Sequence, residues 1–278
     1  MSDDGDLEAP PLPPGSDKYS RGLVCVAAGG AEFPGAGVLC VAGARRGGAG
    51  YVHHVSPAEQ TRALVLQRFP DVVTSEMAPD HVLSRARAFV VGSGTDAQEL
   101  WAGWELQRAL QSAAAVVVDG GAMMAVKENA AVASAIRDRE APVVLTPHRR
   151  EAARLIASDA HHAEVAMELA DATGTVVVLK GPGTVVATAD SVVAVDEIAG
   201  PELATAGTGD VLAGLIGSML AAESALNGLP SPRRCAAVAA QAVRAHSLAG
   251  RAAAARVFSV TALDVADELG AVMRGLRE

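Results

Sequence analysis

Short apolar runs separated by helix-like stretches recur along most of the chain. The runs typical of buried strands are GLVCVAA (22–28), YVHHV (51–55), ARAFVVG (86–92), AAVVVD (114–119) and APVVLT (141–146). Helices are expected between them, at about 36–46, from Pro57 onward, at about 96–111 and between the last two runs. Because strands that alternate with helices form parallel sheets buried on both faces, the pattern predicts an α/β fold with a mostly parallel central sheet.

The last part of the chain breaks this alternation. TVVVLK (175–180) and GTVVAT (183–188) are separated only by Gly-Pro, and SVVAVD (191–196) follows, so we expect a β-meander. Thr261 and Asp264 have the spacing of a helix N-cap and an acidic residue in the first turn. Long helices are expected to complete the fold at about 208–223, 232–250 and 261–276.

The chain shows no internal repeat and no stretch with the composition of an interdomain linker. Residues 1–17 are acidic and rich in proline, and they lack the basic and apolar regions of a signal peptide. We therefore expect a mobile tail over residues 1–17 and a single domain over residues 18–278.

Composition restricts both the core and the partners. Hydrophobic residues make up 50% of the chain but aromatic residues only 3%, so the core must consist mainly of Ala, Val, Leu and Ile. The 23 basic and 32 acidic residues give a net charge of −9. This balance argues against a nucleic-acid-binding protein. No apolar run reaches the length of a membrane span without a charge or a turn residue, so we expect no membrane-spanning helix.

Lysine and cysteine are both rare. None of Lys18, Lys127 and Lys180 lies between a Gly and a Ser or Thr, so the chain cannot contain a P-loop and must bind any phosphate in another way. Cys25, Cys40 and Cys235 form no CxxC pair, and we expect buried thiols in a cytoplasmic protein.

Two glycine-rich segments are candidates for a ligand site. In VVGSGTDA (90–97), Gly92, Gly94 and Ala97 fit a relaxed dinucleotide-binding fingerprint, with Asp119 at the end of the next strand. That fingerprint usually follows the first strand of its fold, and here several strands precede it. A tight turn between a strand and a helix explains these glycines equally well, and the turn can also line another kind of ligand site.

The second segment, ATAGTGDVLAGLIGSMLA (204–221), has Gly207, Thr208 and Gly209 directly before an apolar helix, with Asp210 in its first turn. Small residues let a ligand approach the backbone, and the N–H groups of a helix N-terminus attract anions. A carboxylate beside such an anion hole can accept the proton of a hydroxyl group that attacks a phosphoryl group. The segment thus has what phosphoryl transfer to a hydroxyl group needs, with Asp210 as a candidate base. The simpler interpretation is a helix N-terminus with a favourable acidic residue, which does not by itself need glycine on both sides of Thr208.

Four segments of the chain resemble the ADP-dependent NAD(P)H-hydrate dehydratases of the ribokinase-like superfamily. They are VAAGGAEFPGAGVLCVAGARRGGAGYV (26–52), VLTPHRREAARL (144–155), VLKGPGT (178–184) and ATAGTGDVLAGLIGSML (204–220). The resemblance implies a three-layer αβα sandwich. It also implies repair of the S epimers of NADHX and NADPHX, the 6-hydroxy hydrates of NADH and NADPH. In this reaction ADP phosphorylates the hydroxyl group, and elimination of phosphate leaves NADH or NADPH and AMP.

The resemblance also implies roles for individual residues. The nucleotide-binding positions of the family correspond to Lys180, Gly181, Pro182, Gly183, Thr184 and Gly209. The hydrate-binding positions correspond to Ala36, Gly94, His148 and Asp210, and Asp210 is the presumed base. Further implications are a Mg²⁺ ion, a homotetramer, small-molecule nucleotides as the partners, and a separate epimerase that acts on the same metabolite.

The residue types agree with these roles, but simpler interpretations exist. Lys180 in the KGPGT turn can offer a point charge to a phosphate, or it can be a solvated hairpin lysine. His148 follows Thr146 and Pro147 at the end of an expected strand, where it can contact a ligand or cap a helix. Gly35 and Ala36 permit close approach of a cofactor, but simple helix packing explains them nearly as well.

Some features depart from the family pattern or lie outside it. The turn GSGTD (92–96) is poorer in glycine than the family turn, and DGGA (119–122) keeps Asp119 but lacks a second acidic residue, so Asp119 is a weak candidate for nucleotide or Mg²⁺ contact. The paired histidines at 53–54 and 161–162 are expected at surface or strand-end positions. Arg45 and Arg46 are expected at a solvated helix end.

Two further function classes remain open from the residues. A ribokinase-like kinase for a small alcohol, such as hydroxyethylthiazole or pyridoxal, would use the same GTGD helix. A non-catalytic module that binds nucleotides would explain the altered turns. A Rossmann oxidoreductase is the weakest alternative.

Overall fold

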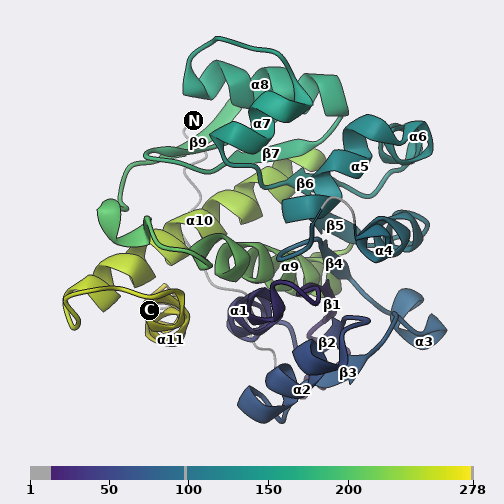
Figure 1. Ribbon diagram of the computed structural model, residues 1–278, viewed down its shortest axis with the longest axis vertical. Helices are drawn as coiled ribbons and strands as arrows, with labels where there is room; N and C mark the ends of the chain where they lie inside the picture. The colour runs from purple at the N-terminus through teal and green to yellow at the C-terminus, as the bar shows by residue number, and fades with distance from the viewer. Residues whose placement is uncertain (1–13, 97–98, 277–278) are drawn as a thin grey trace.

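The computed structural model describes residues 14–96 and 99–276 of the chain. All strands in this part belong to one nine-stranded sheet with the order β3-β2-β1-β4-β5-β6-β7-β8-β9 (Figure 1). Strands β1 to β7 are parallel, and β8 and β9 are antiparallel additions at one edge, so the predicted β-meander is confirmed. The strands are β1 (Leu23–Ala27), β2 (Tyr51–Val55), β3 (Val73–Ser75), β4 (Ala88–Val91), β5 (Ala115–Val118), β6 (Val143–Leu145), β7 (Val176–Leu179), β8 (Thr184–Ala187) and β9 (Val192–Asp196).

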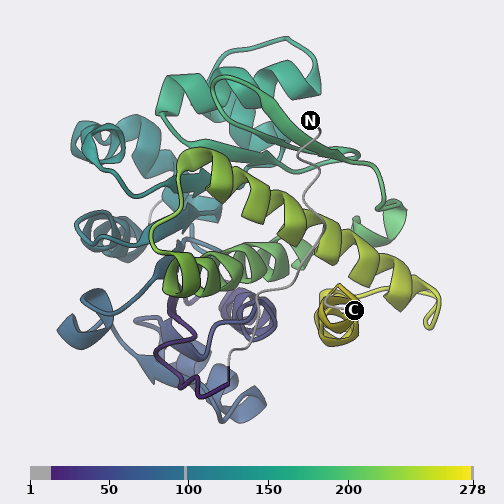
Figure 2. The ribbon, with the colours of Figure 1, turned by 180° about the vertical axis from the view of Figure 1, so that it is seen from behind.

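Helices cover both faces of this sheet, which confirms the predicted three-layer αβα architecture. One face packs against α1 (Pro34–Ala44), α2 (Glu59–Arg68), α9 (Thr208–Asn227), α10 (Pro232–Ala254) and α11 (Ala262–Gly275). The other face packs against α3 (Asp80–Leu83), α4 (Leu100–Leu110), α5 (Met123–Glu128), α6 (Ala130–Asp138), α7 (Arg149–Leu155) and α8 (His162–Thr173). Two 3₁₀ turns, η1 (Gly120–Ala122) and η2 (Pro201–Leu203), complete the described elements. Figure 2 shows the molecule from the opposite side to Figure 1, and in this view α9 and α10 are nearer to the viewer than the sheet.

Alternate residues of the central strands supply the two halves of the core. In β1, Val24 and Val26 face the α9 side, and Leu23, Cys25 and Ala27 face the α4 side. Both halves consist mainly of aliphatic side chains, as the scarcity of aromatic residues predicts. All three cysteines are buried thiols, which confirms the expectation from their spacing.

The pattern missed some elements and misplaced two side chains. Strand β3 and helices α3, α7 and α8 were not among the expected elements. Strand β3 and helix α3 have only three and four residues, which is too short to show a period. His53 and His54 are not surface or strand-end residues, since they are 2% and 0% exposed within β2. The Nε2 atom of His53 lies 2.8 Å from the Ser75 hydroxyl, and that of His54 lies 2.9 Å from the Ala28 carbonyl, so local hydrogen bonds allow their burial.

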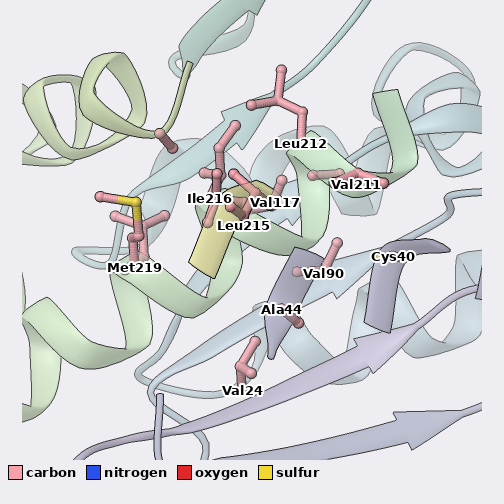
Figure 3. Close-up of a cluster of buried hydrophobic side chains, with 14 of the residues drawn as sticks. Val24, Cys40, Ala44, Val90, Val117, Val211, Leu212, Leu215, Ile216 and Met219 are labelled. Atoms are coloured by element: carbon pink, nitrogen blue, oxygen red, sulfur yellow. The ribbon is translucent and has the colours of Figure 1, made fainter. Parts of the chain in front are cut away.

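Helix α9 is the centre of the core and also begins beside the candidate site. Its side chains Val211, Leu215, Ile216 and Met219 lie among residues of α1 and the central strands (Figure 3). Within the described residues, α9 is also the one helix long and apolar enough to cross a membrane, but 72% of its apolar window is buried inside the protein. Packing in the core therefore accounts for its hydropathy.

Glycines let α1 approach α9 closely. A Cβ atom added at Gly214 would lie 1.9 Å from the Cys40 carbonyl oxygen, and one added at Gly43 would lie 2.0 Å from the Val211 carbonyl oxygen. Both distances are far below van der Waals contact, so a methyl group at either position would force the two helix backbones apart.

We expect Gly214→Ala to lower the free energy of unfolding by about 2 kcal/mol, because the cost of overpacking exceeds the helix propensity that Ala gains. Gly103→Ala is the matched control, since Gly103 lies within α4 and an added Cβ would have no neighbour within 4 Å. This control is expected to raise the free energy by about 0.5–1 kcal/mol. Urea unfolding followed by circular dichroism measures both changes, and equal effects would contradict the proposed packing.

Candidate active site

The carboxyl ends of the parallel strands meet along one edge of the sheet. Strand β1 is the point where the strand order reverses, because β2 and β3 lie on one side of it and β4 on the other. Open α/β sheets bind ligands at such a reversal. Backbone hydrogen bonds join the two loops there: the Gly29 N–H donates to the Ser93 carbonyl at 2.8 Å, and the Gly30 N–H donates to the Gly94 carbonyl at 2.9 Å.

Ala36 and Gly94, both predicted hydrate-site residues, lie against each other at this point. Gly94 has a φ of +63°, and an added Cβ would lie 2.1 Å from the Ala36 Cβ. Gly92 is also held in the left-handed region, with a φ of +106°. These contacts explain why the GSG turn needs glycine. The third position of the proposed dinucleotide fingerprint, Ala97, lies outside the described residues.

Asp119 follows β5 and is the buried centre of a polar cluster. One carboxylate oxygen accepts hydrogen bonds from Lys180 Nζ at 2.8 Å and from the Thr146 hydroxyl at 2.7 Å, and the other accepts from the Ser93 hydroxyl at 2.8 Å. Burial raises the pKa of Asp119, but Lys180 and the two hydroxyl groups outweigh this effect and hold it below the ordinary value. Asp119 is therefore an ionised anchor whose two oxygens are both occupied.

Lys180 follows β7, and its ammonium group pairs with Asp119 in the candidate site. The Lys180 N–H donates to the Pro147 carbonyl at 2.8 Å, which fixes the backbone, and the side chain is only 20% exposed. Burial lowers the pKa of Lys180, but Asp119 and then Glu151 outweigh burial and raise it above the ordinary value. The alternative of a solvated hairpin lysine is wrong, because Lys180 is an ion-pair partner within the site.

Asp210 lies in the first turn of α9, close enough to this pair for its charge to be affected. Burial raises the pKa of its carboxyl group to about 7, with a further rise from Asp119 that the positive charge of Lys180 partly offsets. A carboxyl group that titrates near neutral pH can exchange a proton with a bound hydroxyl group. This position suits the predicted base.

The start of α9 leaves its first N–H groups without a side-chain cap. Gly207, the N-cap residue, has a φ of +89°, and no side chain accepts a hydrogen bond from the helix. The Thr208 hydroxyl donates away from the helix, to the carbonyls of Leu203 at 3.0 Å and Thr205 at 3.1 Å. By contrast, side chains cap the starts of α6, α7 and α11, which confirms the Thr261 and Asp264 prediction. An uncapped helix start can bind an anion.

The predicted nucleotide-binding residues approach this helix start. A Cβ added at Gly209 would lie 3.3 Å from Lys180 Nζ, so the two residues are direct neighbours. Gly181, Pro182, Gly183 and Thr184 form the turn from β7 to β8, in which Gly183 has a φ of +71°. Gly181 and Pro182 are exposed and Gly183 and Thr184 are half-buried, so the turn is accessible to a ligand.

His148 caps a helix, which is one of the two alternatives that its sequence position left open. Its Nδ1 accepts a hydrogen bond from the Glu151 N–H at 3.1 Å, and Glu151 accepts one from the His148 N–H at 2.8 Å, so His148 caps α7. It also pairs with Lys180 in an isolated parallel bridge. The cap therefore holds His148 at the same edge of the sheet as Lys180. The other pair of histidines differs, since His161 is exposed and His162 is half-buried against the Leu179 carbonyl.

A cavity of about 240 Å³ adjoins these residues. Three of its lining residues are close to predicted hydrate-site residues along the chain. Phe33 is three residues before Ala36, Thr95 directly follows Gly94, and Glu151 forms the capping box with His148. The cavity thus extends from the reversal point of the sheet toward α5 and α7. The remaining lining residues are Asp96, Gly120, Gly121, Met123, Met124, Arg154 and Leu155.

Comparison with known families agrees with this geometry. The family model for NAD(P)H-hydrate dehydratase matches residues 24–270 of the chain. The chain belongs to the NAD(P)H-hydrate dehydratase family. The matched residues include all of the described sheet except Leu23 and all helices except the last residues of α11.

Relatives within the dehydratase family differ in length. A bifunctional NAD(P)H-hydrate repair enzyme of Mycobacterium tuberculosis is 37% identical over 224 residues, which cover 80% of this chain but only 44% of that protein. An ADP-dependent (S)-NAD(P)H-hydrate dehydratase of Xanthomonas campestris is 32% identical over 274 residues, which cover 91% of this chain and 88% of that protein. The chain thus spans less than half of the first relative and most of the second.

Solved structures confirm the ribokinase-like fold expected for the dehydratase family. An ADP/ATP-dependent NAD(P)H-hydrate dehydratase of Bacillus subtilis, co-crystallised with ATP and Mg²⁺, superposes with a TM-score of 0.80 and 26% identity over 96% of this chain and 94% of that chain. A ribokinase-like superfamily protein of Enterococcus faecalis gives a TM-score of 0.78 at 22% identity, over 96% of this chain and 92% of that chain.

The sequence did not single out three polar residues that complete the site of this dehydratase-family member. Ser93 and Thr146 are hydrogen-bonded to Asp119, and His246 of α10 is buried with no hydrogen-bond partner at Nε2. Burial lowers the pKa of His246 to about 4, so a neutral imidazole lies behind the start of α9. His246 could have been noticed in the sequence as a polar residue on a mostly apolar helix face.

The described residues do not form a resident metal site. No group of three or more His, Cys, Asp and Glu side chains gathers anywhere in residues 14–96 and 99–276. Both oxygens of Asp119 are already bound by Lys180, Ser93 and Thr146, so the predicted Mg²⁺ contact does not fit this arrangement. Protein-bound Mg²⁺ commonly relies on substrate phosphates and water.

Proposed function

We propose that this protein dehydrates the S epimers of NADHX and NADPHX with ADP as phosphoryl donor, releasing AMP and phosphate. The observation that carries the proposal is the position of Asp210. Its carboxyl group, with a pKa of about 7, lies at an uncapped helix start beside the Lys180–Asp119 ion pair and the reversal point of the sheet. The activity of the Xanthomonas campestris relative supports the same reaction.

In the proposed first step, the Asp210 carboxylate accepts the proton of the 6-hydroxyl group as its oxygen attacks the β-phosphorus of ADP. The bond from this phosphorus to the bridging oxygen breaks, and AMP leaves. The first N–H groups of α9, at Thr208 and Gly209, hold the negative charge of the transferred phosphoryl group. In the second step the C6–O bond breaks and phosphate leaves with the bonding electron pair, C5 loses a proton to water, and the new C5=C6 double bond restores NADH or NADPH.

The substrates occupy opposite sides of Asp210 in this proposal. The nucleotide lies between the turn of Lys180, Gly181, Pro182, Gly183 and Thr184 and the anion hole of Gly207, Thr208 and Gly209. The hydrate lies on Ala36, Gly94 and His148, where the adjoining cavity gives it room. Because Gly209 and Lys180 are direct neighbours, the turn and the helix start can bind phosphates of the same nucleotide, which supports this placement.

The remaining family features are also part of the proposal. We propose a single domain over residues 18–278, a cytoplasmic enzyme, a homotetramer, and Mg²⁺ that accompanies the phosphates of the nucleotide. The bifunctional name of the Mycobacterium tuberculosis relative supports a role for an epimerase activity on the same metabolite.

Incubation of the protein with S-NADHX, ADP and Mg²⁺ is expected to restore the near-ultraviolet absorbance of the dihydronicotinamide, with AMP and phosphate as coproducts. Chromatography of the nucleotides checks this stoichiometry. If neither ADP nor ATP supports recovery with either hydrate, the proposal is wrong. A stable phosphorylated small alcohol as product would instead identify a kinase, and nucleotide binding without turnover would identify a binding module.

A further inference from the structure

The lining of the cavity beside the site combines apolar side chains with one basic residue, Arg154, and two acidic residues, Asp96 and Glu151. Phe33, Met123, Met124 and Leu155 supply the apolar surface. Among its described lining residues, Arg154 alone carries a positive charge. Apolar surface next to a guanidinium group suits a ligand that joins a flat ring to a phosphate, because the ring packs and the phosphate receives a charge-assisted hydrogen bond.

The Arg154 side chain is exposed and has no partner among the described residues. In residues 14–96 and 99–276, no hydrogen bond, ion pair or ring contact involves its guanidinium group. Its backbone is nevertheless fixed, because Lys127 Nζ donates to the Arg154 carbonyl at 2.5 Å. The nearest acidic lining residue on α7, Glu151, is instead held in the capping box of His148. Arg154 is therefore an exposed cation on a fixed backbone, and its guanidinium donors are available to a ligand.

We infer that Arg154 binds a phosphate group of the NAD(P)H hydrate and so contributes to recognition of that substrate. The inference rests on the proposed function, which places the hydroxylated ring near Asp210 and leaves the rest of the dinucleotide to be held elsewhere. The cavity lies next to the predicted hydrate-site residues, because its lining residue Phe33 is a direct neighbour of Gly94 and its lining residue Glu151 forms the capping box with His148. Arg154 belongs to the same lining. The phosphate is either part of the pyrophosphate bridge, present in both hydrates, or the 2′-phosphate of NADPHX.

Steady-state kinetics of Arg154→Ala with S-NADHX and S-NADPHX tests the inference and separates the two phosphates. We expect KM for the hydrate to rise about tenfold, the effect of losing one charge-assisted hydrogen bond, with kcat and KM for ADP unchanged. An equal rise for both hydrates assigns the pyrophosphate, and a rise for NADPHX alone assigns the 2′-phosphate. An unchanged KM for both hydrates would overturn the inference.

Two controls keep the result interpretable. Arg150→Ala removes an exposed arginine from the same helix, outside the cavity lining, and is expected to leave all constants unchanged. Arg154→Gln retains the side-chain bulk and is expected to behave like Arg154→Ala, with wild-type thermal unfolding for both variants.

Fluorescence titration with NADH and NADPH gives a readout that does not need turnover. Weaker binding of these products to Arg154→Ala would support phosphate recognition even if the wild type failed to dehydrate either hydrate, which would count against the proposed function alone. Active wild type with unchanged product binding and unchanged KM in Arg154→Ala would count against the inference alone.

Discussion

Asp210→Asn is expected to lower kcat for hydrate dehydration by about 10²–10⁴-fold, the range usually lost with a general base. Asparagine keeps the shape of the side chain but cannot accept the proton of the hydroxyl group. The N–H groups of α9 and the Lys180 turn are unchanged, so the Kd for ADP is expected to stay within about threefold of wild type. Stopped-flow or steady-state assays measure kcat, and calorimetry measures ADP binding. A large loss of ADP binding would show that Asp210 is structural.

The pH dependence gives a second check on the same residue. Because the pKa of Asp210 is about 7, wild-type kcat/KM is expected to rise as the pH increases through about 7 and the carboxylate forms. This pKa lies above the value of 3.8 for an ordinary aspartate, so the folded protein binds the proton more tightly than the unfolded chain. Asp210 therefore lowers stability as the pH rises from about 4 to 7. At about pH 8, Asp210→Asn is expected to unfold at a higher temperature than wild type, while at about pH 3 the two should be similar.

Much of this fold could be predicted from hydrophobic patterning. The central strands β1, β4, β5, β6 and β7 are apolar throughout, because helices cover both faces, and such runs are easy to find. Strand β3 and helix α3 escaped prediction because they are stabilised by their neighbours and not by a pattern of their own. His53 and His54 were misplaced for a related reason: the hydrogen bonds that allow their burial come from Ser75 and Ala28, which are distant in sequence.

The candidate site was predictable only in part. The GTGD segment marks Asp210 and Gly209 locally, since glycines before an apolar helix imply a backbone exposed to a ligand. Nothing in the sequence pairs Lys180 with Asp119, because 61 residues separate them and only the order of the strands places β5 and β7 on either side of β6. The pKa of Asp210 depends mainly on burial and then on the charges of Asp119 and Lys180, and so it could not be inferred before the fold was known.

Helix α9 links stability and function in this protein. Its buried face, including Val211, Leu215 and Ile216, holds it against the sheet and α1, while its uncapped first turn carries Asp210 and Gly209. The burial that fixes the helix also supplies the main cause of the raised Asp210 pKa. A substitution that loosens the α1–α9 contact, such as Gly214→Ala, is therefore expected to affect catalysis as well as unfolding.

Lys180→Met is expected to lower the free energy of unfolding by about 3 kcal/mol, because it leaves the Asp119 carboxylate buried without its ion-pair partner. Asp119 is 3% exposed, so water cannot replace the ammonium group. Because the pKa of Asp119 is lowered in the fold, Asp119 stabilises the folded state at pH values above 3.8, its pKa in the unfolded chain. Because the pKa of Lys180 is raised, Lys180 stabilises the folded state at pH values below 10.5, its pKa in the unfolded chain. The difference in the free energy of unfolding between wild type and Lys180→Met is thus expected to be largest between these two pH values. It should shrink as the pH falls through the folded pKa of Asp119.

The matched variants are Asp119→Asn and the double variant Asp119→Asn with Lys180→Met, which complete a double-mutant cycle. The double variant is expected to be more stable than Lys180→Met, since no uncompensated carboxylate remains. Lys180→Met should also move the rise of kcat/KM with pH to higher pH, because Lys180 lowers the pKa of Asp210. Denaturant unfolding and pH–rate profiles measure the two effects. Unchanged stability together with an unchanged profile would mean that the ammonium group does not pair with Asp119 in solution and serves the nucleotide alone.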